Sequence, residues 1–198
     1  MPVFFRFILW AITLHVLFGA SIPQVLAEED FRLTPWQIIQ TRHTTIKYRT
    51  TEDLMLFHTH IRFGPVKWNR SLELENMTQE EITAMVRDKV DALFVRAQEI
   101  LDMKKRFEPV NILVHGDEEA LKRAYESIYS GECRIRAWYR FKTNTVYLNA
   151  QDLNQGILAH ELAHAIIDHY LTIKPPPQTA EILARYVDSH LDRGFISN

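Results

Sequence analysis

The segment His-Glu-Leu-Ala-His, from His160 to His164, constrains this chain more than any other stretch. It fits the pattern H-E-x-x-H, with two histidines four residues apart. On an α-helix such residues share one face and lie about 6 Å apart along the axis, so both imidazoles can reach one metal ion. Glu161 projects about 100° around the helix from His160. Its carboxylate should therefore border the metal without binding it, where a general base for water belongs.

The same helix carries an apolar stripe, which predicts that it is buried. The stripe consists of Leu158, Leu162, Ala165 and Ile166. We predict Asp152 as the N-cap of this helix. The alternative is an ordinary core helix with a chance histidine pair, and the residues that follow decide between the two.

A catalytic zinc ion takes three protein ligands, so the histidine pair needs a third partner. Three prolines, Pro175–Pro177, follow the helix and predict a stiff turn. Thr179 then offers an N-cap for a second helix over residues 180–188. Glu181 falls in the first turn of that helix, and the short turn can return it to the histidines. We therefore predict Glu181 as the third ligand; the alternative is a solvated glutamate that only stabilises its own helix.

Other residues are poorer candidates for the third ligand. A metzincin site, H-E-x-x-H-x-x-G-x-x-H, would need glycine at 167 and histidine at 170, where the chain has Ile167 and Tyr170. His169 points about 140° away from His164 on a continuous helix, so we place it near the helix C-terminus or at the surface.

From Pro109 to about Leu191 the chain resembles the gluzincin metallopeptidases, in particular the small peptidase MA-like domains. Their pattern is HExxH, a linker, and a helix of the form E-G-x-A-x-Y. The positions that match are His160, Glu161, His164, Glu181, Ala184 and Tyr186. Ile182 departs from the family glycine, and Arg185 stands where thermolysin-like enzymes have aspartate. The carboxylate that orients the histidines is therefore unassigned, with Asp168 and Asp188 as candidates.

The resemblance implies a zinc metallopeptidase with one zinc ion per chain and a peptide or protein substrate. It implies an α+β, zincin-like single domain with a small mixed sheet, the HExxH helix and a following third-ligand helix. Glu161 would be the general base, and Tyr186 or Tyr139 could stabilise the oxyanion. For both tyrosines the alternative is a core residue whose hydroxyl is already hydrogen-bonded. One alternative is a catalytically inactive zincin-like binding module in the periplasm or cell envelope. Another is a structural zinc site, which would need a fourth protein ligand.

Residues 134–141 alternate in character and predict a strand, followed by a turn and a returning strand over residues 145–149. In zincins the strand at the edge of the cleft pairs with an extended peptide. We assign that role to residues 134–141, because alternating arginines discourage aggregation of an open strand. The candidate substrate-binding residues are Arg134, Arg136, Trp138 and Tyr139.

Residues 1–27 have the pattern of a signal peptide. Arg6 precedes an apolar run from Phe7 to Ala20, Pro23 closes it, and Val25-Leu26-Ala27 suits cleavage after Ala27. The run is short for a membrane span. We predict a periplasmic or secreted protein without stable membrane insertion after cleavage; an uncleaved N-terminal membrane anchor is the alternative.

Residues 28–198 have the length of one ordinary domain. Its predicted parts are an N-terminal strand and helix region over residues 28–77, a scaffold helix over residues 78–104 and a catalytic core over residues 109–192. Thr78 and Glu81 form a capping box at the start of the scaffold helix.

Composition excludes two classes of function. Residues 1–27 contain one of the 23 basic residues and none of the 25 acidic ones, which leaves 22 basic against 25 acidic residues. This balance argues against a nucleic-acid partner. The single cysteine, Cys133, cannot form an internal disulfide and has no histidine motif around it, so we predict a free thiol without catalytic chemistry.

Overall fold

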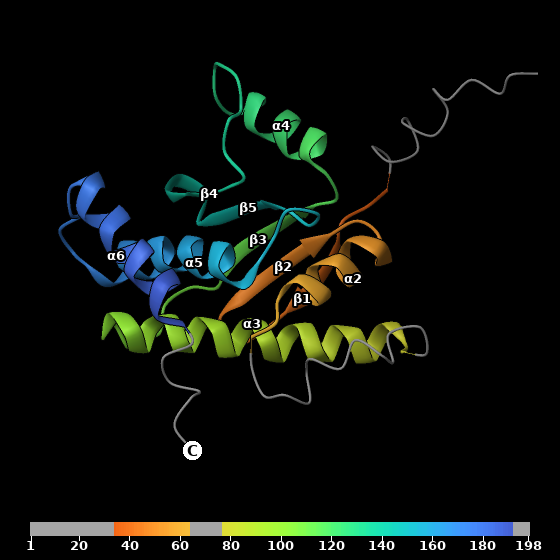
Figure 1. Ribbon diagram of the computed structural model, residues 1–198, viewed down its shortest axis with the longest axis horizontal. Helices are drawn as coiled ribbons and strands as arrows, with labels where there is room; N and C mark the ends of the chain where they lie inside the picture. Colours follow the sequence, from red (N-terminus) through yellow and green to blue (C-terminus); the bar gives the residue numbers. More distant parts are fainter. Residues whose placement is uncertain (1–33, 64–76, 192–198) are drawn as a thin grey trace, which may run out of the picture. The chain divides into compact units, whose positions relative to one another are not determined.

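The computed structural model describes residues 34–63 and 77–191, all within a compact unit that begins at Thr34. The predicted signal peptide lies outside the described residues. The described part contains five α-helices and a five-stranded sheet, which confirms the predicted α+β class with a small mixed sheet (Figure 1). Within these two ranges, no helix combines the length and apolar character needed to cross a membrane.

The sheet has the strand order β1-β2-β3-β5-β4. Its strands are β1 (Gln37–Gln40), β2 (Thr44–Tyr48), β3 (Val110–His115), β4 (Ala137–Arg140) and β5 (Thr145–Asn149). The pairings of β3 with β2 and with β5 are parallel, and the two outer pairings are antiparallel. β4 therefore lies at one edge of the sheet, as predicted for this segment.

β4 is shorter than the predicted strand over residues 134–141. The antiparallel pairing of β4 with β5 begins at Ala137, opposite Leu148, so Arg134 and Arg136 lie before it. Arg136 instead forms an ion pair with Asp152. The prediction that Arg134 and Arg136 lie in the strand was therefore wrong.

The helices are α2 (Thr51–His60), α3 (Gln79–Leu101), α4 (Glu118–Glu126), α5 (Gln155–Tyr170) and α6 (Pro177–His190), with the 3₁₀ turn η3 (Phe141–Thr143) between β4 and β5. α3 is the predicted scaffold helix, and Thr78 and Glu81 form the expected capping box. It ends earlier than predicted because Asp102 adopts the left-handed conformation, with φ 53°, which breaks the helical hydrogen-bond pattern.

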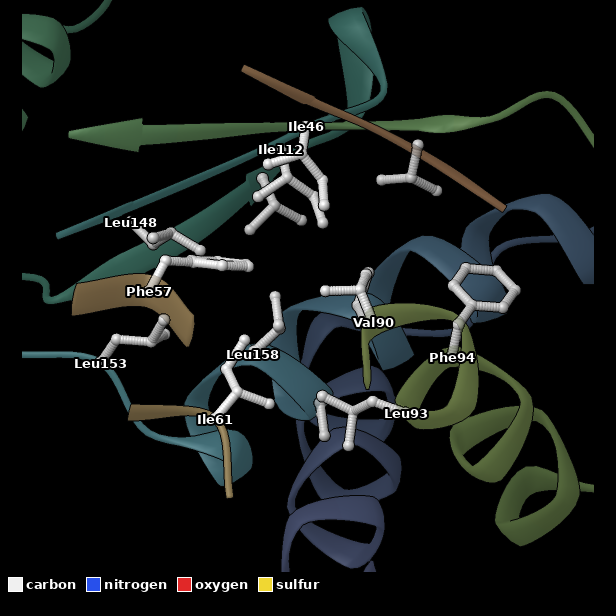
Figure 2. Close-up of a cluster of buried hydrophobic side chains, with 14 of the residues drawn as sticks. Ile46, Phe57, Ile61, Val90, Leu93, Phe94, Ile112, Leu148, Leu153 and Leu158 are labelled. Carbon is white, nitrogen blue, oxygen red and sulfur yellow. The ribbon is translucent and has the colours of Figure 1, made fainter. Parts of the chain in front are cut away.

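Buried side chains pack on both faces of the sheet, because successive residues of a strand point to opposite sides. The larger core lies between the sheet and helices α2, α3 and α5 (Figure 2). Its members include Phe57, Val90, Ile112, Leu148 and Leu158. On the other face, Leu121 of α4 packs with Trp138 and Tyr147. The larger core thus holds α5, which carries His160 and His164, against the sheet.

Candidate metal centre

The helix that carries the HExxH motif forms as predicted. Its N-cap is Asn154, whose side chain accepts a hydrogen bond from the backbone N–H of Ile157 at 2.9 Å. The predicted cap, Asp152, was wrong because its carboxylate binds Arg136 instead. The apolar stripe is fully buried: Leu158, Leu162, Ala165 and Ile166.

Three side chains from α5 and α6 converge on one point. The Nε2 atoms of His160 and His164 are 3.2 Å apart, and Oε2 of Glu181 is 3.5 Å from each of them. In a tetrahedral site with zinc–ligand bonds of about 2.0–2.1 Å, two ligand atoms lie about 3.3–3.4 Å apart. The three donors therefore fit a zinc ion with little movement. Within residues 34–63 and 77–191, they are the one group of His, Cys, Asp or Glu side chains placed to share a metal.

α6 begins at Pro177, two residues before the predicted cap Thr179. Proline suits the first helical position because its φ is already helical and its missing N–H is not needed there. Glu181 consequently lies in the second turn, beyond the reach of the strongest helix-dipole effect. The helix dipole therefore gives little reason for a glutamate at this position. Close packing of α6 against α5 brings it to the histidines instead (Figure 1).

The two carboxylate oxygens of Glu181 have different partners. Oε1 accepts a hydrogen bond from Nε of Arg185 at 2.7 Å, whereas Oε2 faces the histidines. Partial burial raises the pKa of Glu181, but the Arg185 hydrogen bond and His160 outweigh that effect, so the pKa lies below its ordinary value. Arg185 therefore holds one oxygen of the Glu181 carboxylate, which leaves the other free to face the histidines.

The histidines are partly accessible, with side chains that are 20% and 23% exposed for His160 and His164. Burial and the neighbouring His160 lower the pKa of His164, and the negative charge of Glu181 offsets this only in part. Neutral imidazole is the form that offers a lone pair to a metal. The lowered pKa of His164 thus favours the form that can bind a metal, and both histidines remain partly exposed to solvent.

Glu161 is buried beside this centre, with 8% of its surface exposed. The backbone N–H of Tyr139 in β4 lies near its carboxylate and favours the charged form. Burial raises the pKa of Glu161 to about 7, against the opposing effect of the Tyr139 N–H, and the negative charge of Glu181 adds to the rise. The edge strand therefore lies beside the candidate base.

The hydroxyl of Tyr139 points to a different partner. It donates a hydrogen bond to Oδ2 of Asp168 at 3.1 Å, and Oδ1 of Asp168 is 2.7 Å from Nζ of Lys174. Burial and the charge of Asp168 raise the pKa of Tyr139. Asp168, a candidate partner for a histidine, thus joins β4 to the end of α5. No sequence pattern indicated this contact between residues 29 positions apart.

The other predicted site residues contact side chains outside the candidate metal centre. Tyr186 is half exposed, and its ring stacks on His190 with centroids 3.8 Å apart. Trp138 is buried and stacks on Tyr147 at 4.5 Å. Arg134 forms an exposed ion pair within its own loop. Roles of these residues in substrate binding or oxyanion stabilisation stay predictions.

Comparisons with known proteins add no relative to this description. No family model matches the chain, and neither the curated proteins nor the solved structures gave a match. The candidate site is therefore described from its own residues alone. In it, an α+β domain presents two histidines and a glutamate beside a buried carboxylate.

Proposed function

We propose that this chain is a zinc-dependent metallopeptidase with a zincin-like, gluzincin-type domain. The observation that carries the proposal is the spacing of 3.2–3.5 Å among the donor atoms of His160, His164 and Glu181. A structural zinc site would use four protein ligands, and the group within the described residues has three. An open position beside a buried carboxylate is typical of a catalytic site.

His160, His164 and Glu181 would hold the zinc ion. When bound, zinc supplies polarisation of a carbonyl and a lowered pKa of water. The carboxylate of Glu161 would accept the proton that water loses and deliver it to the leaving amine nitrogen. The N–H of Tyr139 lies near that carboxylate and favours its charged form.

β4 supports a peptide as the substrate. It is an edge strand whose antiparallel partner β5 lies on one side only, among the residues that the structure describes. An extended peptide could pair with the other side through backbone hydrogen bonds. Because Tyr139 of the same strand lies beside Glu161, such a peptide would lie next to the candidate base.

The variant Glu161→Gln tests this mechanism. Glutamine keeps the shape of the side chain but cannot take the proton, and loss of a general base costs about 10²–10⁴-fold in rate. We expect the variant to bind one zinc ion per chain by metal analysis and to bind peptides without cleaving them. His160→Ala, His164→Ala and Glu181→Ala should lose zinc and cleavage together.

Glu119→Gln, an exposed substitution on α4, is the matched control and should cleave like wild type. Equal cleavage by wild type and Glu161→Gln would place the activity elsewhere. If wild type binds zinc but cleaves nothing across a broad peptide library, the protein is an inactive zincin-like binding module instead.

A further inference from the structure

A cavity of about 380 Å³ lies between two loops that are remote in sequence from the candidate metal ligands. One loop joins β1 to β2 and the other joins α3 to β3. The lining residues are Arg42, His43, Gln98, Lys104, Lys105 and Arg106. Four of these six residues carry a positive charge and none is acidic. We call this cavity the basic pocket.

The four cations of the basic pocket are not neutralised by direct pairing. Within the described residues, none of their side chains forms an ion pair. Some other exposed cations of the same structure are paired, for example Arg134 with Glu132 and Arg185 with Glu181. Four cations gathered without ion-pair partners repel one another, and a bound anion would relieve that repulsion.

The C-terminal end of α3 explains only part of this arrangement. Its negative dipole end favours cations in the following residues, such as Lys104. Arg42, however, lines the pocket from the loop between β1 and β2, which the dipole of α3 does not explain. Burial lowers the pKa of His43, Asp91 opposes this, and both Arg42 and Arg106 lower it further. The two guanidinium groups therefore act on the same imidazole from different loops.

Both loops are held in place by buried or satisfied groups. Gln98 is 7% exposed, and its Nε2 donates hydrogen bonds to the carbonyls of Met103 at 3.2 Å and Lys105 at 2.8 Å. This single amide fixes the backbone that carries the cations. A pocket that needs no ordering when a ligand arrives loses less conformational entropy on binding.

Asp91 fixes the other loop. Its carboxylate accepts hydrogen bonds from the backbone N–H groups of Arg42 at 3.0 Å and His43 at 3.2 Å. The ring of His43 stacks on Phe94 with centroids 4.6 Å apart. Asp91 offsets one of the four positive charges, so the pocket keeps a clear positive excess.

We propose that the basic pocket binds a phosphate-bearing anion. A phosphate group offers several acceptor oxygens, which match the guanidinium and ammonium donors that surround the cavity. The cavity volume lies at the lower end of the usual range for small-molecule sites, about 300–1,000 Å³. That room accommodates a diphosphate or a phospholipid headgroup. This proposal is independent of the proposed peptidase activity.

Titration calorimetry of the full chain with pyrophosphate at low ionic strength tests the site. The double variant Lys105→Gln/Arg106→Gln should weaken binding about tenfold or more, because two charge-assisted contacts are lost. The control Lys122→Gln/Lys142→Gln removes the same charge outside the pocket and should leave the affinity within about twofold of wild type. Equal losses in the two double variants would overturn the proposal in favour of general attraction.

Gln98→Met separates a built pocket from a mere charge cluster. It keeps all four cations but removes the two hydrogen bonds that fix their loop, so we expect several-fold weaker pyrophosphate binding in a protein that still unfolds cooperatively. Unchanged affinity in this folded variant would refute the preformed site. Should Gln98→Met fail to fold, the two charge variants alone decide the question.

Vesicles distinguish the two sources of phosphate. Flotation with phosphatidic acid in phosphatidylcholine, against phosphatidylcholine alone, tests for a lipid headgroup. Binding to the acidic vesicles that Lys105→Gln/Arg106→Gln abolishes would assign a membrane lipid, whereas pyrophosphate binding without vesicle binding would assign a free phosphate compound. Binding to neither at about 1 mM ligand would overturn the proposal.

Discussion

The carboxylate of Asp188 on α6 occupies the space in which a side chain at Gly156 on α5 would begin. A Cβ atom at Gly156 would overlap Oδ1 of Asp188 and lie 3.0 Å from its Cγ. Asp188 is two helical turns beyond Glu181, so both residues project from the same face of α6. The close approach at Gly156 thus belongs to the packing that presents Glu181 to the histidines. Asp188 lies at the start of α5, where the helix dipole favours a negative charge.

Gly156→Ala should therefore have different effects in two backgrounds. In the wild-type chain it should lower stability by about 1–3 kcal/mol through overpacking and weaken zinc binding by displacing α6. In an Asp188→Ala background the main obstacle is gone and only Oδ1 of Asn154, 3.2 Å from the added Cβ, must shift slightly, so most of the cost should disappear. Urea unfolding and chelator competition measure both. An equal cost in the two backgrounds would show that Asp188 is not the obstacle.

Arg185→Ala tests whether Arg185 orients the third ligand. Partners that orient metal ligands typically contribute about 10–100-fold in affinity, but exposed ion pairs contribute about 0–1 kcal/mol. Arg185 is 74% exposed, so we expect the smaller effect. Zinc affinity should fall by about two- to fivefold in a chelator competition. Zinc affinity should fall less in Arg185→Lys. A loss of zinc binding in Arg185→Ala as complete as in Glu181→Ala would contradict a purely orienting role.

The two candidate oxyanion tyrosines should behave differently. Because the Tyr139 hydroxyl is bound to Asp168, Tyr139→Phe should cost about 1 kcal/mol of stability and leave kcat almost unchanged. Tyr186 is the remaining candidate, and Tyr186→Phe should lower kcat by about 10–100-fold without loss of stability if a tyrosine serves the oxyanion. Steady-state kinetics on a cleaved peptide measure both variants. A large fall in kcat for Tyr139→Phe alone would reverse this assignment.

Stability should fall as the pH drops from about 6.5 to about 4. Burial, with Lys89, lowers the pKa of His58 to about 4, and burial, with Arg49, does the same for His115. In this window the unfolded chain binds protons that the folded chain does not, so acid favours unfolding. Each histidine should remove about 3 kcal/mol by pH 4, since one pKa unit corresponds to about 1.4 kcal/mol.

Chemical denaturation between pH 7 and pH 4 measures this dependence. His115→Phe keeps an aromatic ring between Trp36 and Tyr147 and should reduce the pH dependence by about half. A pH profile identical to wild type would show that His115 does not titrate in this window.

Local sequence was enough to predict the parts of the site that lie on one helix. The spacing of His160 and His164 fixes their common face because helical geometry repeats over four residues. The capping box of Thr78 and Glu81 fixed the start of α3 for the same reason, since a cap involves only neighbouring residues. β1 was not predicted, because its four residues carry little pattern of their own and depend on pairing with β2.

Contacts between segments required the tertiary structure. Asp152 and Asn154 are both good caps by residue type, and the distant partner Arg136 decided between them. Arg136 lies before β4 and pairs with Asp152, 16 positions away, which no residue near it could reveal.

The sequence by itself thus determined that His160 and His164 share one face of α5, and it proposed Glu181 as the partner of that face. Only the packing of α6 against Gly156 set the distance of 3.5 Å between Glu181 and each histidine. The same division holds for the basic pocket. Arg42 and Arg106 line it together because the strands that follow their loops, β2 and β3, pair side by side in the sheet. Bond geometry and helical periodicity act over a few residues, whereas convergence across tens of residues is decided by how the buried apolar faces fit together.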